Sequence, residues 1–128
     1  MEIQPAELID KMSIVRLKIE RVGEPHLKEE YSECEKAIDA LRKNGVKIKE
    51  EWIHELYIIN GKIWDLDFKM RDYVDKEVEN ISGEEFKGIG KDALKIMDLM
   101  KQRVEIKNKI TEELDIGFKE IKIDHVAA

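Results

Sequence analysis

Hydrophobic residues recur every three or four positions along most of the chain, which is the spacing of one buried face of an amphipathic α-helix. Between the two prolines and seven glycines, long stretches show no alternation of period two, the pattern of a half-buried β-strand. The sequence therefore predicts an all-α protein. Four segments carry the helical spacing, and they cover residues 5–22, 27–44, 47–73 and 82–114.

Local signals support the ends of these segments. Pro5 stands in a first turn, where its missing N–H and fixed φ are tolerated. Asn44 and Gly45 supply the left-handed residue that commonly closes a helix. Ser82 and Glu85 have the spacing of a capping box, in which each side chain bonds the backbone N–H of the other residue. The last two predicted helices are longer than the first two.

Short connections between the segments would place successive helices antiparallel. We therefore expect one domain over residues 1–128, folded as an antiparallel up-down-up-down four-helix bundle with two shorter and two longer helices. The residues that follow, with Phe118, Ile121 and Ile123, are expected to form a short extended C-terminal tail. At a rise of about 1.5 Å per residue, the longer helices would project beyond the shorter pair and leave an apolar end uncovered. This end predicts a homodimer, unless the tail folds back over it.

Composition narrows the classes of partner and compartment. The chain has 128 residues with 23 Lys plus Arg and 29 Asp plus Glu, so its net charge of −6 repels a polyphosphate backbone and disfavours nucleic acid. Cys34 is the single cysteine, which excludes a disulfide within the chain. The first residues do not have the pattern of a signal peptide, and no apolar run approaches the roughly 18 residues of a membrane span. We therefore expect a cytoplasmic protein that does not enter a membrane.

Two cations interrupt the apolar seam of the fourth segment. Arg103 and Lys107 follow Ile96 and Met100 at positions where a coiled-coil heptad would be apolar. They are four residues apart, so they repel each other on a helix, and burying them without an acidic partner is costly. We therefore expect polar partners from other helices. The candidates on the first and third segments are Glu7, Asp10, Lys11, Asn60, Trp64, Asp67 and Arg71.

Three interpretations of this polar stripe are open. In the first, a helix of 3.6 residues per turn drifts off the heptad, Val104 and Ile106 take the seam, and the cations reach outwards to water. In the second, the stripe is a buried structural salt network. In the third, Arg71, Arg103 and Lys107 hold an anionic ligand.

Several of these residues also carry a resemblance. The run Pro-Ala-Glu-Leu-Ile-Asp-Lys at 5–11 and the run Asn-Gly-Lys-Ile-Trp at 60–64, together with Arg71, Arg103 and Lys107, resemble an uncharacterised family of small bacterial and phage proteins. That family reads Gly-Glu-Leu-Ile-Asp-Lys at its start and Asn-x-x-Leu-Trp in its middle. Ala6 replaces the glycine and Ile63 the leucine. The resemblance spans nearly the whole chain and implies that the polar stripe is a shared feature, but it implies no activity.

Other motifs are incomplete. Glu51 and His54 form one Glu-x-x-His motif. Di-iron bundles carry two such motifs, and the second is missing. Residues 29–33 spell the Glu-Glu-x-x-Glu seen in all-α nucleotide pyrophosphohydrolases, without a suitable Glu-x-x-Asp on the next helix. Residues 99–103 resemble the arginine-bearing helix of chorismate mutase, without the rest of its cations. We therefore predict no metal and no cofactor.

The sequence favours an oligomeric helical interaction module or small-anion-binding module. The alternative is a small all-α enzyme that acts on a phosphate- or carboxylate-bearing substrate. In that enzyme, Arg71 and the two seam cations would bind the substrate, Glu7 or Asp67 would move a proton, and Asn60 would orient a polar group.

Overall fold

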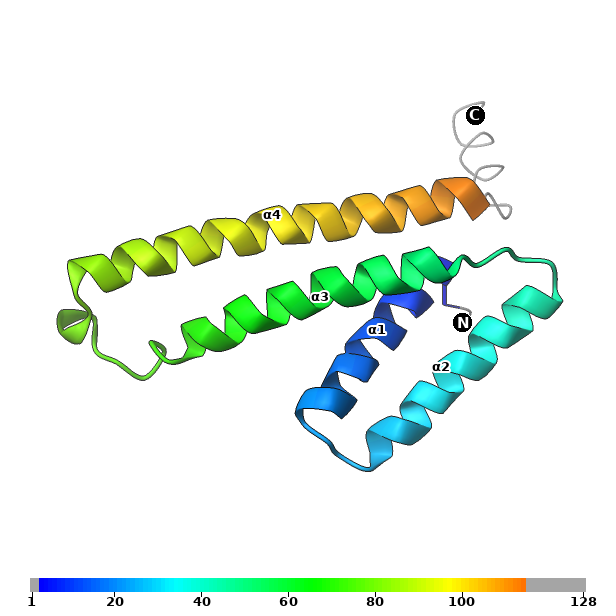
Figure 1. Cartoon of the computed structure of the whole chain (residues 1–128), viewed down its shortest axis with the longest axis horizontal. Coiled ribbons are helices and arrows are strands. Elements are labelled where there is room, and N and C mark those ends of the chain that lie inside the picture. The colour runs from blue at the N-terminus through cyan, green and yellow to red at the C-terminus, as the bar shows by residue number, and fades with distance from the viewer. Residues whose placement is uncertain (1–2, 115–128) are drawn as a thin grey trace, which may run out of the picture.

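The computed structural model describes residues 3–114, and these residues are helical with no strand among them (Figure 1). The all-α class predicted from the sequence is thus confirmed for this part of the chain. Over the same residues, no helix combines the length and the apolar character that a membrane crossing requires. The elements are α1 (Pro5–Arg21), α2 (His26–Lys43), α3 (Glu50–Arg71), the short 3-10 helix η1 (Val78–Asn80) and α4 (Gly83–Leu114).

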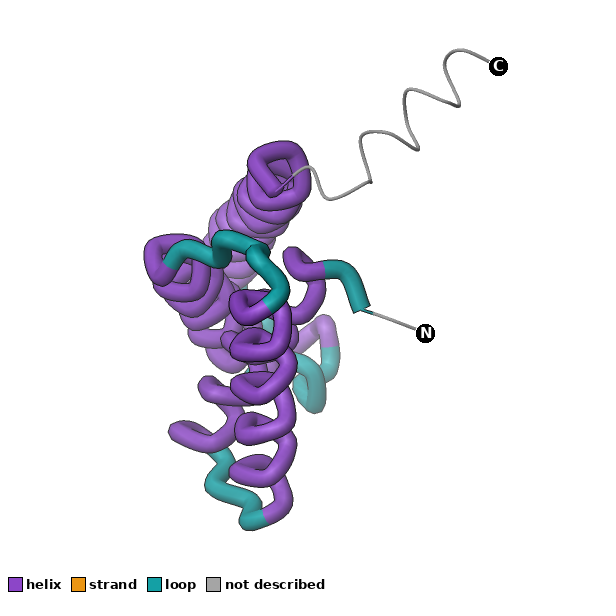
Figure 2. The backbone as a smooth tube through the Cα atoms, turned by 90° about the vertical axis from the view of Figure 1, so that its right-hand side faces the viewer, coloured by secondary structure: helices purple, strands orange, loops and turns teal. Residues whose placement is uncertain are grey.

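The four helices form two helical hairpins. The first consists of α1 and α2, and the second of the longer α3 and α4, with each pair lying side by side (Figure 1). The first hairpin is inclined to the second, and α1 packs against all three other helices (Figure 2). The up-down-up-down bundle therefore stays a prediction, and the expected C-terminal tail lies outside the described residues.

The second hairpin reaches well past the first. Its outer part, residues 66–100, is called the arm here, and Figure 1 shows it extending to the side away from α2. The part of the second hairpin that contacts α1 is called the root. The expectation that the two longer helices project beyond the shorter pair agrees with this arrangement.

Local signals place the helix ends near their predicted positions. Gly23 follows α1 with φ +77°, and Gly45 follows α2 with φ +89°, a region that favours glycine. Beyond Gly45, the N–H of Val46 donates to the Leu41 carbonyl at 3.0 Å, which closes α2 in a Schellman motif. The capping box before α4 is also present. Ser82 Oγ accepts from the Glu85 N–H at 3.1 Å, and Glu85 Oε1 accepts from the Ser82 N–H at 3.2 Å.

The hydrophobic core lies at the root. Ile9 of α1, Leu56 of α3 and Ile110 of α4 are fully buried and meet where the three helices cross. Trp52 is buried beside them. In α4, the buried residues are Ile110 at the root and Asp92 in the arm. The arm is therefore a pair of helices with little core of its own, positioned by the packing at its root.

Candidate functional site

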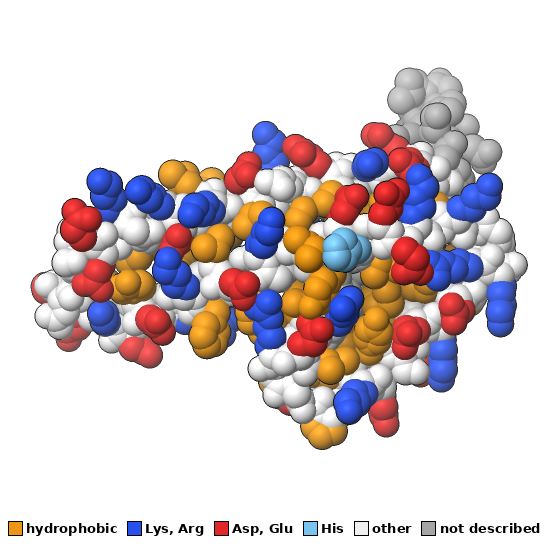
Figure 3. Space-filling view, in the orientation of Figure 1, with side chains coloured by type: hydrophobic (Ala, Val, Ile, Leu, Met, Phe, Trp, Pro, Cys, Tyr) orange, Lys and Arg blue, Asp and Glu red, His pale blue; other side chains and the backbone are white. Residues whose placement is uncertain are grey.

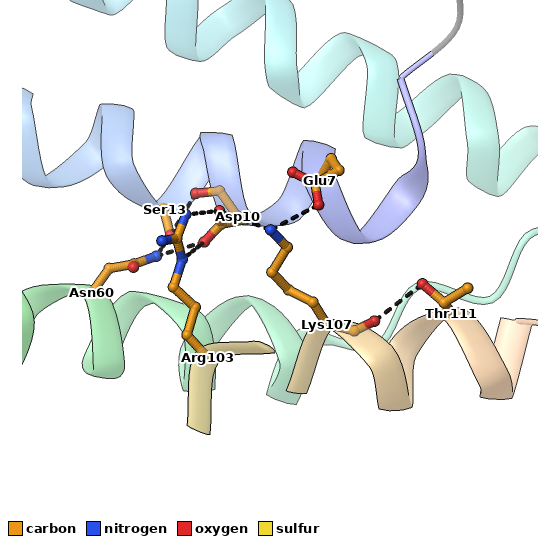
Figure 4. A network of polar contacts seen from close by, with 7 residues as sticks. All are labelled: Glu7, Asp10, Ser13, Asn60, Arg103, Lys107 and Thr111. Carbon is orange, nitrogen blue, oxygen red and sulfur yellow. Dashed lines mark hydrogen bonds and ion pairs between the residues drawn. The ribbon is translucent and has the colours of Figure 1, made fainter. Parts of the chain in front are cut away.

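A buried carboxylate pairs with a cation from the other hairpin at the centre of the root. Asp10 of α1 is 3% exposed. Arg103 of α4 donates from Nε to Asp10 Oδ1 at 3.0 Å and from Nη2 to Oδ2 at 2.5 Å (Figure 4). This is the two-pronged arrangement in which a guanidinium matches a carboxylate most closely. The pair joins residues 93 positions apart in the sequence.

An amide from the third helix completes the surroundings of this carboxylate. Asn60 Nδ2 donates to Asp10 Oδ1 at 2.8 Å and to Ser13 Oγ at 2.7 Å, which uses both of its hydrogens. The Ser13 hydroxyl donates in turn to the Asp10 backbone carbonyl at 2.7 Å. Asn60 and Ser13 thereby link α1 to α3 and add a hydrogen bond to the carboxylate that Arg103 already holds.

A second ion pair lies one helical turn along α4. Lys107 Nζ is 2.7 Å from Glu7 Oε1 and 3.7 Å from Asp10 Oδ2, so this cation contacts both acids of α1 (Figure 4). The Lys107 side chain is 19% exposed, whereas that of Glu7 is 54% exposed. Thr111 donates its hydroxyl to the Lys107 carbonyl at 3.1 Å. We call Glu7, Asp10, Ser13, Asn60, Arg103 and Lys107 the root network.

The two seam cations therefore point inwards, and the interpretation in which they reach outwards to water is wrong. Val104, which that interpretation moved into the seam, is 54% exposed, whereas Ile106 packs against the core as it expected. The cations point inwards because α1 presents two carboxylates at the same level as Arg103 and Lys107. The attraction between these charges and the satisfied hydrogen bonds offset the loss of hydration.

The charges of the root network balance. Burial raises the pKa of Asp10, but hydrogen bonds from Arg103 and Asn60, with the charges of Arg103 and Lys107, outweigh burial and bring that pKa below the ordinary 3.8. The hydrogen bonds to Asp10 also raise the pKa of Arg103. Both partners are therefore ionised at neutral pH. Two cations and two carboxylates leave no net charge for a bound anion to neutralise.

Four of the residues predicted from the sequence lie outside the root network. Lys11 neighbours Asp10 in sequence but is exposed. The guanidinium carbon of Arg21 lies 5.8 Å from the centroid of the Trp64 ring. Asp67 and Arg71 form an exposed ion pair with each other at 3.2 Å. The structure therefore brings together Glu7, Asp10, Asn60, Arg103 and Lys107, and corrects the expectation that Arg71 joins the two seam cations.

Sequence reasoning missed one member, Ser13. The signal was present, because Ser13 follows Asp10 by three residues and so shares its helix face. A hydroxyl at that spacing also bonds back to the carbonyl of the preceding turn, as this one does. Serine carries no charge, so the need of two cations for acidic partners did not point to it.

A hollow beside the root network opens at the exposed end of that network. It measures about 280 Å³ and lies between the start of α1 and the last turns of α4. Its lining residues are Gln4, Ala6, Glu7, Val104, Lys107, Asn108 and Thr111. Asp10 and Arg103 do not line it, so a ligand in this hollow would meet Lys107 and Glu7 first.

The incomplete metal motifs do not gather into a site. Over residues 3–114, no three His, Cys, Asp or Glu side chains come together as a metal ion would need. Glu51 and His54 are exposed on α3, and Glu29 and Glu33 are exposed on α2.

Comparison with known proteins adds no identification. No family model, no curated protein and no solved structure matches the chain. The resemblance to the small bacterial and phage family therefore stays a prediction from the quoted motifs. The function has to be argued from the root network and the surfaces it positions.

The first prediction concerns the buried pair. Asp10→Asn removes the charge that Arg103 and Lys107 face while it keeps the side-chain size, so two cations are left in a largely buried setting. We expect a loss of about 3 kcal/mol in the free energy of unfolding, measured by urea denaturation. Asp67→Asn is the matched control, because the Asp67–Arg71 pair is exposed, and its effect should lie within experimental error. Equal losses in the two variants would contradict a special role for the buried pair.

The second prediction follows from the lowered pKa of Asp10. Because an Asp in an unfolded chain has a pKa of about 3.9, the unfolded state takes up the proton first as the pH falls. The carboxylate's contribution is therefore complete above about pH 5 and is lost as the pH falls below about 4. The readout is the unfolding free energy of the wild type minus that of Asp10→Asn. This difference should be constant near neutrality and shrink in acid; growth in acid would refute the assignment.

Proposed function

We propose that the chain is a helical interaction module whose arm is the docking surface. The observation that supports this is a line of exposed apolar side chains on the outer part of α4. Leu94 and Met97 are each 67% exposed, and Met100 is 44% exposed. Phe68 of α3, 63% exposed, and Phe86 of α4 add aromatic surface to the same arm. Figure 3 shows hydrophobic side chains along the arm between the charged ones.

The exposed side of α4 in the arm is continuous with the side of α4 that contacts α1 at the root. Met100 lies seven residues before Lys107, so it occupies the same side of α4 two turns nearer the tip. At the level of Lys107 this side contacts α1. At the level of Met100 and Met97, these side chains are exposed. A further helix would cover this side as α1 covers the root.

The chemistry of these side chains suits a protein partner. Methionine is flexible and polarisable, so it adapts to different packing surfaces and is common where one face binds helices. Exposed apolar side chains that gather on one face, rimmed by charges, typically mark such an interface. The exposed lysines on the outer part of α4 provide this rim of charge.

The root network fits this proposal as a positioning device. Its hydrogen bonds link α1, α3 and α4 at fixed relative heights, because each donor meets one particular oxygen. Buried ion pairs contribute little to net stability against apolar replacements, and their best-attested use is to fix register. In this proposal, the network sets the direction in which the arm leaves the root.

Photocrosslinking tests the docking role and gives the third prediction. A benzophenone amino acid is placed at Leu94 or Met97 in the arm, and at Val22 or Ile58 as exposed apolar controls outside it. We expect irradiation in native cells to produce discrete adducts from the arm positions and none from the controls, because a docked partner lies within reach of the arm only. Adducts absent from all four positions, or equally abundant at all four, would contradict the proposal.

A second candidate function is supported by the hollow of about 280 Å³ at Lys107. A small phosphate- or carboxylate-bearing ligand there would displace Glu7 and contact Lys107, Asn108 and Thr111. If the module were an enzyme, Glu7 would be the one carboxylate among the lining residues able to move a proton.

The fourth prediction tests that anion site. Glu7→Gln removes the competing carboxylate, so inorganic phosphate should raise the melting temperature of this variant more than that of the wild type. Glu7→Gln combined with Lys107→Met should lose the shift. The absence of a phosphate-dependent shift in all three proteins would remove the support for an anion site.

A further inference from the structure

We propose that the occupant of the arm is the arm of a second copy of this chain, lying antiparallel to it. The inference rests on the proposed function, because it names the partner of the same docking surface. It is carried by the separation of charge along the arm, by the apolar residues at both of its ends, and by a glycine at the middle of the exposed face.

The tip of the arm is acidic. Residues 72–85 hold six carboxylates and one cation, Lys76, which pairs with Glu85 at 3.3 Å. The other five acids have no ion-pair partner among residues 3–114, and all five are exposed. We call them the acidic tip: Asp72, Asp75, Glu77, Glu79 and Glu84.

The side of α4 that follows the tip is basic. Lys87, Lys91, Lys95 and Lys101 are exposed and have no ion-pair partner within residues 3–114, and we call these four residues the lysine row. Asp98 lies among them and accepts a hydrogen bond from Gln102 at 2.8 Å. From the tip to Lys101, just past the arm, the second hairpin therefore has an acidic end and a basic length, and neither set of charges has an ion-pair partner in the described part of the chain.

Only one relative orientation of two arms gives both the acidic tip and the lysine row a partner of opposite charge. In a parallel pair, acidic tip lies against acidic tip and lysine row against lysine row, so both contacts repel. In an antiparallel pair related by a twofold axis, the acidic tip of each copy lies beside Lys95 and Lys101, the far end of the lysine row of the other, and the favourable contact occurs twice. The charge pattern thus selects a second copy and its direction.

The apolar residues agree with this overlap. The tip carries exposed Val74 and Val78 near the exposed Phe86, and the lysine row flanks Leu94 and Met97. When the arms overlap in opposite directions, the first set of one copy covers the second set of the other. From Gly83 to Met97 the overlapped part of α4 is about 21 Å long, comparable to an ordinary helix–helix contact.

Gly90 marks the middle of the overlap. It lies in the interior of α4, where a glycine costs about 1 kcal/mol relative to alanine, and a Cβ added there would meet no atom of the chain within 4 Å. No contact within residues 3–114 requires glycine at this position, and the same holds for Gly88; the missing side chain at Gly90 leaves room for a second backbone to approach closely. With the twofold axis at Gly90, Lys95 of one copy is level with Glu85 of the other, since each lies five residues from Gly90 within α4, and Lys101 reaches past the start of the other copy's α4 towards its acidic tip.

Charge reversal tests the proposal and gives the fifth prediction. The wild-type chain of 15.0 kDa should sediment as a dimer whose dissociation constant rises with salt. Lys95→Glu with Lys101→Glu, or Glu77→Lys with Glu79→Lys, should each weaken self-association at least tenfold, because like charges then meet at both contacts. Lys28→Glu with Lys36→Glu on α2 is the control and should leave the dimer unchanged, and circular dichroism checks that each variant is folded.

Mixing the two arm variants distinguishes arm pairing from a loss of fold. One variant has an acidic lysine row and the other a basic tip, so an equimolar mixture should form a heterodimer although neither variant pairs with itself. A chain carrying all four substitutions should dimerise again. A wild-type monomer at every concentration, a dimer indifferent to both reversals, or a mixture that stays monomeric would overturn the inference.

The outcome is separable from that of the proposed function. Arm crosslinks to a different protein, with a monomeric chain in solution, would leave the arm as a docking surface and overturn its pairing with a second copy. An absence of arm crosslinks in cells, together with a monomer in solution, would overturn both.

Discussion

The buried carboxylate of Asp10 is the constraint on which the placement of α1, α3 and α4 depends. Hydrophobic contacts among Ile9, Leu56 and Ile110 favour association of these helices, but they are non-directional and tolerate a slide along a helix axis. The Asp10 carboxylate does not tolerate such a slide. A shift of α4 by one turn would replace Arg103 with Leu99 and leave a buried charge without its two-pronged partner, a far larger penalty than a changed apolar contact.

Much of the helical layout follows from local chemistry that the sequence displays openly. The Ser82 and Glu85 capping box and the glycine after α2 act within a few residues of chain, so their spacing alone predicted them. The inclination of the first hairpin to the second was not predictable in this way. It depends on how side chains of distant segments interlock, and a hydrophobic period identifies a buried face without saying which helix covers it or at what angle.

The same limit explains why the sequence predicted only part of the root network: a period does not say which helix covers a face. On α3, Asn60, Trp64, Asp67 and Arg71 follow one another at helical spacing and looked equivalent in sequence. In the structure, α1 ends at Arg21 beside Asp65, so only Asn60 lies at the level of Asp10; Trp64 lies beside Arg21, and Asp67 and Arg71 continue into the arm and meet solvent. Periodicity gives the face on which a residue lies, whereas the length and direction of the neighbouring helix decide whether that face is buried.

The distance between the root network and the end of the arm has a mechanical consequence. Arg103 lies twenty residues from Gly83, so the end of α4 is about 30 Å from the ion pair. A rotation of only about 5° at the ion pair would carry that end through roughly 2.6 Å, more than the tolerance of a close-packed contact. A small change in the geometry of the Asp10–Arg103 pair would therefore be amplified into a large displacement at the far end of the second hairpin.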